Sequence, residues 1–117
     1  MSRVDYLNLI PSQQNVRSGE PLNVLLMAVN IGKQPQRHTF HLFAQAAGCD
    51  WVDVAQKAYE LAPKEHLHAY LQVPGEVFCA KFWGLEELDE LTLFAADAPP
   101  KQIKKGNNCA KLIFVLP

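Results

Sequence analysis

The stretch that decides the fold is LNVLLMAVN, residues 22–30. In an extended strand, alternate side chains point to opposite faces. One face carries Leu22, Val24, Leu26 and Ala28, and the other carries Asn23, Leu25, Met27 and Val29. Both faces are therefore largely apolar. Such a strand either lies at the centre of a sheet or has an outer face that something else covers.

Turn signals divide the rest of the chain into further short strands. Gly and Pro punctuate the sequence before residue 22 and after residue 30, because Gly tolerates a positive φ and Pro fixes its own. The apolar or alternating segments between such signals are residues 4–10, 22–30, 38–46, 51–61, 66–73, 91–96 and 110–116. About seven short strands with turns every ~8–12 residues predict an all-β fold. We expect an Ig-like or fibronectin III-like β-sandwich with Greek-key connections, formed as a single domain over residues 1–117.

Two segments are less regular than the others. Residues 51–61 begin as a strand and continue in a pattern that also suits a helix, but strands on both sides favour a strand. Residues 78–90 contain Phe82, Leu85 and Leu88 at a helix-like spacing. Residues 98–108 are predicted to form a loop.

Composition sets wide limits on function. The chain has 117 residues, 49% of them hydrophobic and 20% charged, with a formal net charge of −1. A chain of this kind can bury a core of its own and is too apolar to be disordered. The small net charge offers little attraction to nucleic acid, and no apolar run approaches the ~18 residues of a membrane span. We therefore expect neither nucleic acid nor a membrane as a partner.

The cysteines and the N-terminus indicate the compartment. Cys49, Cys79 and Cys109 are an odd set without a C-x-x-C pair, which favours three reduced thiols. None of them opens a helix whose N-terminus would activate a thiolate for catalysis. The first residues lack the basic segment and apolar core of a signal peptide. We expect a cytoplasmic protein, with leaderless secretion as the alternative.

Six segments of the chain form a series of motifs in fixed order. They are 19–20 (GE), 22–30, 40–45 (FHLFAQ), 60–65 (ELAPKE), 71–74 (LQVP) and 112–117 (LIFVLP). This series resembles the first of the two C-terminal β-barrel domains of animal-type transglutaminases. The family pattern has a Gly-acidic turn, an apolar strand ending in Asn, and a strand ending in Ala-Gln. A Glu-Leu-x-Pro-x-Glu turn, a strand ending in Leu-x-aliphatic-Pro and a last strand ending in Pro then follow.

The resemblance implies an Ig-like or fibronectin-like barrel that is not itself catalytic. In the family these barrels fold against a catalytic core domain and occlude its active-site region. The implied partner is therefore another protein or a neighbouring domain of a parent chain. The catalytic motif of the family is absent here, and Phe94 stands where guanine-nucleotide-binding members place an Arg. We expect neither transamidase activity nor nucleotide binding. The alternative function is a free-standing Ig-like binding or inhibitor protein with a protease or carbohydrate target.

The histidines are the first candidates for a metal site. His66 and His68 share one face of a strand, whereas His38 and His41 point to opposite faces, and zinc needs three or four converging ligands. Cys49 and its neighbour Asp50 would join such a set only through tertiary structure. We therefore predict no catalytic residues, no cofactor and no metal. The solvent-facing side of the strand is expected to carry His66, His68, Tyr70 and Gln72.

Charge is separated along the C-terminal part of the chain. Residues 76–97 contain six acidic residues and one Lys, and residues 98–117 contain four Lys and no acidic residue. The two segments would attract each other or a partner, but exposed pairs contribute only about 0–1 kcal/mol each. We interpret the acidic run of residues 86–90 and the basic loop with Lys101, Lys104 and Lys105 as two solvated loops.

The second apolar face of residues 22–30 predicts an interaction surface. Leu25, Met27 and Val29 point outward if the opposite face is the core. Phe43 also points outward, and if the two strands are neighbours, the four side chains form one patch of roughly several hundred Å². Trp83 is a further interaction candidate, and its alternative role is a hydrophobic plug at the end of the sandwich. The alternative for the patch is that residues 51–59 or 78–90 fold over it.

Overall fold

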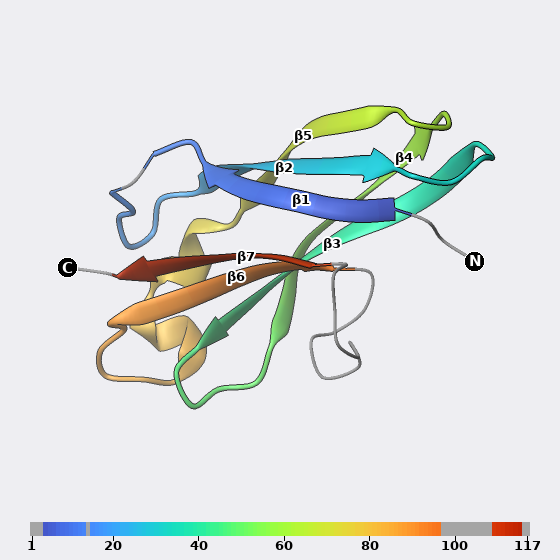
Figure 1. Ribbon diagram of the computed structural model, residues 1–117. Helices are drawn as coiled ribbons and strands as arrows, with labels where there is room; N and C mark the ends of the chain where they lie inside the picture. The colour runs from blue at the N-terminus through green and yellow to red at the C-terminus, as the bar shows by residue number, and fades with distance from the viewer. Residues whose placement is uncertain (1–3, 14, 97–108, 116–117) are drawn as a thin grey trace.

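The computed structural model describes residues 4–13, 15–96 and 109–115. These residues form seven β-strands in two sheets, together with two short 3₁₀ helices (Figure 1). The elements are β1 (Val4–Pro11), β2 (Leu22–Asn30), β3 (Gln36–Ala46), β4 (Val52–Leu61), β5 (His66–Val73), η1 (Gly75–Phe78), η2 (Ala80–Trp83), β6 (Glu90–Ala96) and β7 (Cys109–Val115).

The two sheets pack face to face as a sandwich. Sheet A has the strand order β1-β2-β5, and sheet B has the order β4-β3-β6-β7. All neighbouring strands are antiparallel. The chain crosses between the sheets from β2 to β3, from β4 to β5 and from β5 to β6, which is the Greek-key arrangement of a β-sandwich. The predicted fold class is confirmed.

The strands follow the predicted segments closely. Residues 51–61, which favoured a strand over a helix, form β4 apart from Trp51. The helix-like spacing in residues 78–90 corresponds to the end of η1, all of η2 and an irregular segment before β6. Gly84, at φ 72°, ends η2 after a single turn, since this left-handed conformation suits Gly best. The predicted loop over residues 98–108 lies outside the described residues.

The alternation of β2 builds one side of the core. Its inward side chains, Leu22, Val24, Leu26 and Ala28, are at most 1% exposed. The facing side chains of β3 are Phe40, Leu42, Ala44 and Ala46, all fully buried. Removing apolar surface from water contributes about 25 cal/mol per Å², so this interface is the main source of stability. The inward face predicted for residues 22–30 is confirmed.

One polar pair lies inside this core. The Tyr6 hydroxyl and His38 Nε2 are 2.9 Å apart, in a buried hydrogen bond between β1 of sheet A and β3 of sheet B. Both rings also pack on Phe40, with centroids 5.5 Å away for Tyr6 and 4.6 Å for His38. Buried polar groups are tolerated when they are paired, and this pair explains how a histidine fits between the sheets.

Asn30, at the end of β2, organises the corner between the sheets. Its side-chain Nδ2 donates to the carbonyl oxygens of Gln34, Leu61 and Ala62 at 3.0, 3.1 and 3.2 Å. Its Oδ1 accepts hydrogen bonds from the backbone of Gly32 and the side chain of Gln36, both at 2.9 Å. The fully buried Asn30 side chain therefore ties the β2–β3 turn to the end of β4.

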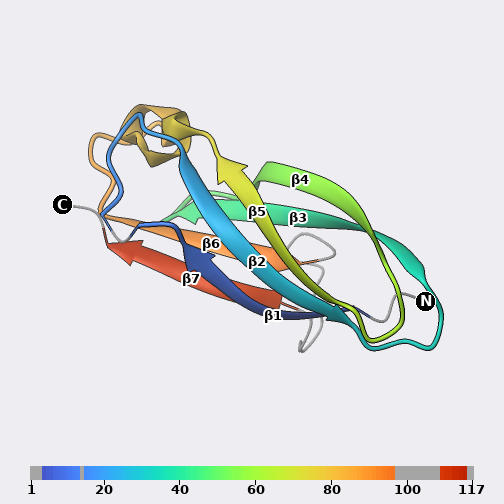
Figure 2. The ribbon, with the colours of Figure 1, turned by 90° about the horizontal axis from the view of Figure 1, so that it is seen from above.

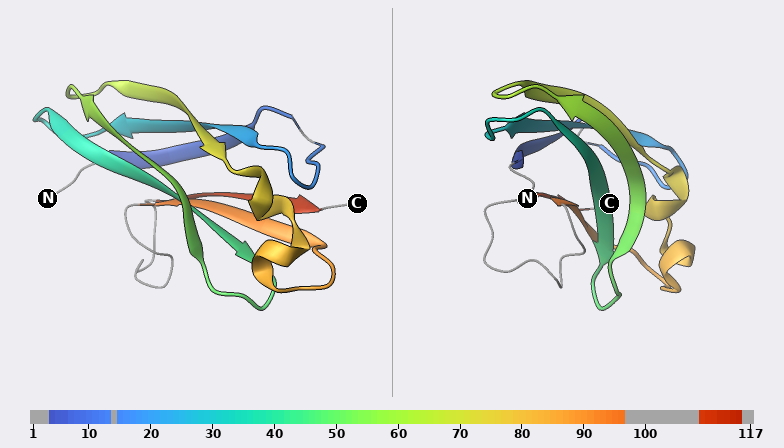
Figure 3. Two further views of the ribbon diagram at one scale, coloured as in Figure 1. Left: turned by 180° about the vertical axis from the view of Figure 1, so that it is seen from behind. Right: turned by 90° about the vertical axis from the view of Figure 1, so that its right-hand side faces the viewer.

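The 3₁₀ helices close one end of the sandwich, next to the loop between β1 and β2 (Figure 3). The backbone N–H of Gly19 donates to the carbonyl of Gly75 at 3.2 Å. A Cβ at Gly75 would overlap the carbonyl group of Gly19, so this close approach requires glycine. On the other side of η1, Trp83 Nε1 donates to the carbonyl of Val77 at 2.8 Å.

Candidate interaction surfaces

Three rows of side chains run across β1, β2 and β5 on the outer face of sheet A, and the exposed polar pair Asn23 and Gln72 lies beside the first row. The strand register places Ile10, Leu25 and Tyr70 in the first row, Asn8, Met27 and His68 in the second, and Asp5, Val29 and His66 in the third. Side chains directly opposite each other in antiparallel strands lie about 4.5–5.5 Å apart at Cβ. The first row is therefore apolar across all three strands. In the other two rows only the β2 residue, Met27 or Val29, is apolar.

The apolar side chains of this face are open to solvent. Tyr70 is 61% exposed and Ile10 is 41% exposed, while Leu25, Met27 and Val29 are partly exposed. Figure 2 looks onto β1, β2 and β5, and no described segment passes over them. Residues 51–59 belong to sheet B or its edge, and residues 78–90 lie at the end of the sandwich. Neither of the two segments considered as a cover lies on this face.

The structure brings three of the five predicted interaction residues together. Leu25, Met27 and Val29 follow one another along the outer face of β2, as the alternation indicated. Phe43 does not join them, because β3 belongs to sheet B and β2 pairs only with β1 and β5. The prediction that Phe43 and the β2 residues form a single patch is therefore wrong. Consecutive strands of a Greek-key sandwich often lie in different sheets, which is why the assumption of neighbouring strands failed.

Phe43 lies on the outer face of sheet B within an aromatic cluster. It is only 6% exposed and stands opposite Phe94 of β6. Its ring stacks on His41 at 5.8 Å, and Phe94 packs against Trp51 at 5.6 Å. His41 Nδ1 is in turn 2.9 Å from the carboxylate of Asp53. Phe94, the residue in place of the family's Arg, is thus half-buried in an aromatic environment.

Trp83 lies at the end of the sandwich, away from both outer faces. Its ring is half-buried against the core, and its neighbour Phe82 packs on it edge to face at 5.0 Å. Cys49 Sγ lies 3.9 Å from the Trp83 carbonyl. This placement matches the plug described for Trp83 from the sequence, and an interaction role for Trp83 stays a prediction.

Sequence reasoning missed Ile10 and Tyr70, the most exposed apolar side chains in the rows on sheet A. Tyr70 was assigned to the solvent side of its strand together with His66, His68 and Gln72, and all four are exposed as expected. What the sequence lacked was the pairing of β2 with β1 and β5. The alternation of residues 66–73 was a signal for Tyr70. The alternation of residues 4–10 was not one for Ile10, because the β-bulge between Tyr6 and Asn8 is what turns Ile10 outward.

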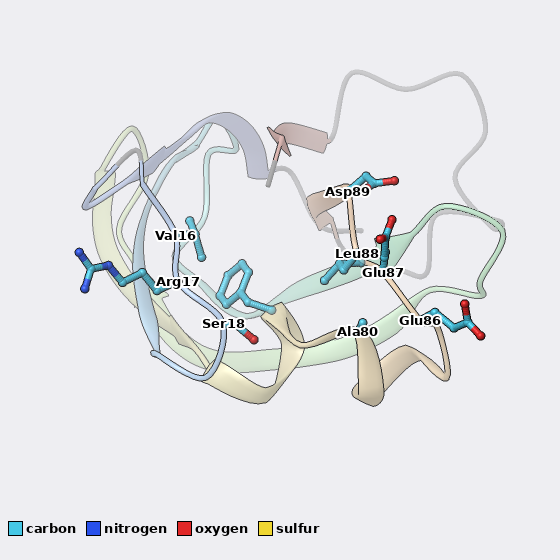
Figure 4. Close-up of a pocket in the computed structure, with 9 residues that line it drawn as sticks. Val16, Arg17, Ser18, Ala80, Glu86, Glu87, Leu88 and Asp89 are labelled. Atoms are coloured by element: carbon cyan, nitrogen blue, oxygen red, sulfur yellow. The ribbon is translucent and has the colours of Figure 1, made fainter. Parts of the chain in front are cut away.

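An open cavity of about 610 Å³ lies between the β1–β2 loop and the segment before β6. It is lined by Val16, Arg17, Ser18, Phe78, Ala80, Glu86, Glu87, Leu88 and Asp89. Figure 4 shows the Arg17 guanidinium turned to the opposite side from Glu86 and Asp89. Glu86, Glu87 and Asp89 are all exposed, which agrees with a solvated acidic segment. Of the basic segment, Lys101, Lys104 and Lys105 lie outside the described residues, whereas Lys111 is an exposed residue of β7.

Other chemistry leaves little trace in the described part of the chain. Within it, no three His, Cys, Asp or Glu side chains gather in a way that would hold a metal ion. Cys49 and Cys79 are free, and Cys79 accepts a hydrogen bond from the Ser18 hydroxyl at 3.1 Å. No helix among the described residues has the length and apolar character needed to cross a membrane.

Comparison with known proteins identifies the fold and not a family. No family model matches the chain, and no curated protein matches it. Among solved structures, it is similar to a β-glucosidase from Erythrobacter marinus, with a TM-score of 0.76 and 14% identity over 99% of this chain and 16% of that chain. It is also similar to a β-glucosidase from Listeria innocua, with a TM-score of 0.70 and 13% identity over 99% of this chain and 16% of that chain. A cycloisomaltooligosaccharide glucanotransferase from Paenibacillus sp. has a TM-score of 0.70 and 9% identity over 99% of this chain and 14% of that chain.

The chain spans about one sixth of the length of these three enzymes. At such low identities the likeness shows a shared β-sandwich fold and nothing of their activity. None of the three is a transglutaminase. The comparisons therefore support the Ig-like sandwich that the transglutaminase resemblance implied and leave that family without confirmation.

Proposed function

We propose that the chain is a non-catalytic β-sandwich domain that binds another protein, or a neighbouring domain of a parent chain, through the outer face of sheet A. The observation that carries this proposal is the apolar row Ile10, Leu25 and Tyr70, which is open to solvent on all three strands. A sandwich strand needs only one apolar face for its own core. The second apolar face therefore points to a further burial partner.

Two settings fit this role. The similar solved structures are much longer glycosidase-type chains, which supports an accessory domain beside a catalytic domain. The sequence resemblance to a transglutaminase barrel supports the same role beside a different catalytic core. In both settings the chain itself is not an enzyme and binds no nucleotide. Its thiols stay reduced, as in the cytoplasm.

A free-standing binding protein with a carbohydrate target is the second candidate. It is favoured by the aromatic cluster on the outer face of sheet B, where Trp51 and Phe94 lie beside the polar pair His41 and Asp53. Aromatic surfaces with a few placed polar groups are typical of small-ligand sites. Quenching or shift of tryptophan fluorescence by oligosaccharides, lost in Trp51→Ala, would favour this function over the first.

The test of the proposed function compares proteins captured by the immobilised chain with those captured by a double variant, Leu25→Ser with Met27→Ser. We expect the captured partner to be lost with the double variant. It should be retained with Thr39→Ala plus Gln56→Ala, a control at two exposed positions on the outer face of sheet B. Equal capture by the wild type and the Leu25/Met27 variant would contradict the proposal.

A further inference from the structure

We propose that the partner of this surface is a second copy of the chain, and that two copies associate weakly by packing the outer faces of their A sheets together. This inference rests on the proposed function, since it names the partner of the same face. It is carried by the order of side chains across the three rows, which is complementary to itself under a two-fold rotation.

The two-fold axis runs parallel to β2, between the two sheets. Rotation about it exchanges the positions of β1 and β5 and keeps each row at its own height. Leu25, Met27 and Val29 then each lie against the same residue of the second copy. Ile10 faces Tyr70 of the second copy, and Asn8 faces His68 of the second copy. Within the three rows each apolar residue meets an apolar residue, and the amide of Asn8 meets an imidazole that can hydrogen-bond with it. Leu7, which is exposed at the bulge of β1, belongs to none of the rows.

The remaining pair is Asp5 with His66 of the second copy, which places a carboxylate opposite an imidazole. Asp5 also has an interaction within its own chain, so this pair adds to that interaction. The pair lies at the rim of the face, where such complementarity guides orientation more than it adds affinity. In this arrangement the apolar first rows of the two copies lie on each other, and so do the polar third rows.

The other two-fold arrangement, with the axis across the strands, fits less well. It reverses the order of the rows, and with the axis through the second row it places the third row on the first. Asp5 then lies on Ile10 of the second copy, and His66 lies on Tyr70 of the second copy. A carboxylate held against an aliphatic side chain loses water without gaining a partner, which is unfavourable. The parallel arrangement avoids this contact within the three rows.

The size of the face sets the strength of the contact. Three strands about 4.8 Å apart and roughly eight residues long cover roughly 400 Å² per copy. Two such faces bury about 800 Å², which is below the ~1,200 Å² of a stable interface and typical of a transient one. We therefore expect a concentration-dependent dimer rather than a permanent one.

Sedimentation equilibrium on the 117-residue chain tests the dimer, at concentrations up to about 1 mM because the interface is small. In the variant Asn8→Lys with His68→Lys, like charges face each other twice, so the dissociation constant should rise at least about tenfold. In Asn8→Lys with His68→Glu, opposite charges face each other, and the dimer should be at least as strong as that of the wild type. With the axis across the strands, each new charge would face the same residue of the second copy. Like charges would then meet in both variants, and the dimer of the Asn8→Lys, His68→Glu variant would also be weakened.

The matched control is Thr39→Lys with Gln56→Lys, which adds the same charge to exposed positions on the outer face of sheet B. It should leave the dissociation constant unchanged. A wild type that stays monomeric, a like-charge variant that dimerises as the wild type does, or a control that weakens equally would each overturn the dimer. If the dimer is overturned but the Asn8/His68 variants keep the wild-type melting temperature, the face is still an exposed surface, and the proposed function stands with a different protein as the partner. If the variants fail to fold, the face is internal and the proposed function is wrong as well.

Discussion

At the scale of single residues, adjacent side chains of β2 have opposite environments. Leu26 is fully buried between the sheets, whereas Leu25 is partly exposed on the outer face of sheet A. The same residue type therefore has two different roles one position apart. The alternation that separates them is visible in the sequence, and it correctly assigned the whole of residues 22–30.

Truncation of the buried leucine should be costly. Leu26→Ala removes side-chain atoms from a fully buried position of the core, so the free energy of unfolding should fall by about 2–5 kcal/mol. His66→Ala, at an exposed position of sheet A, should change it by less than about 0.5 kcal/mol. Urea denaturation measures both values. Equal losses for the two variants would mean that the faces of sheet A are assigned the wrong way round.

Asn30 should be as sensitive as a core residue although it is polar. Asn30→Ala removes five side-chain hydrogen bonds from a fully buried site and leaves buried carbonyl groups without their donor. We expect a loss of about 2–4 kcal/mol in urea denaturation. Asn23→Ala, an exposed Asn on the same strand, is the matched control and should be nearly neutral. A neutral Asn30→Ala would show that the corner does not depend on this side chain.

The role of Asn30 was not predictable from its position at the end of an apolar run. Its partners Leu61 and Ala62 are more than thirty residues away in the sequence. They lie at the end of β4, where the chain leaves sheet B for β5 of sheet A. The burial of His38 was hidden for the same reason, since its partner Tyr6 belongs to the other sheet. Local pattern gives the direction of a side chain, and tertiary pairing decides whether a polar group can be buried there.

At the scale of elements, the sequence predicted all seven strands but not their neighbours. Alternation and turn residues are local properties, so they locate strands such as β5 to the residue. Pairing is a property of the whole fold, and β2 pairs with β5, about forty residues further on, rather than with β3. This difference separated Phe43 from the interaction surface and brought in Tyr70 instead.

The 3₁₀ segment depends on the close approach of two loops. Gly75→Ala places a methyl group on the backbone of Gly19, which cannot rotate away as a side chain would, so η1 and the β1–β2 loop must separate. Overpacking of this kind should lower the free energy of unfolding by about 1–3 kcal/mol. Glu76→Ala, at the next and exposed position, is the control. A Gly75→Ala variant as stable as Glu76→Ala would argue against the packing of η1 on this loop.

At the scale of the whole molecule, the two sheets present different outer faces. Sheet A carries exposed apolar side chains on all three of its strands, while sheet B carries an aromatic cluster in which Phe43 is nearly covered. The sequence indicated an outward apolar face on β2 without the residues that extend it. The fold was thus accessible from local patterns, and the extent of the surface required the register of three strands.

The most direct test of the central claim is the melting temperature of the double variant Leu25→Ser with Met27→Ser, measured by circular dichroism. If the outer face of sheet A is an exposed interaction surface, the melting temperature should stay within a few degrees of the wild type. Val24→Ser with Leu26→Ser, which alters the fully buried face of the same strand, should abolish cooperative unfolding. A fall of more than about 15 °C in the Leu25/Met27 variant would show that this face belongs to the core, and the account given for it would be contradicted.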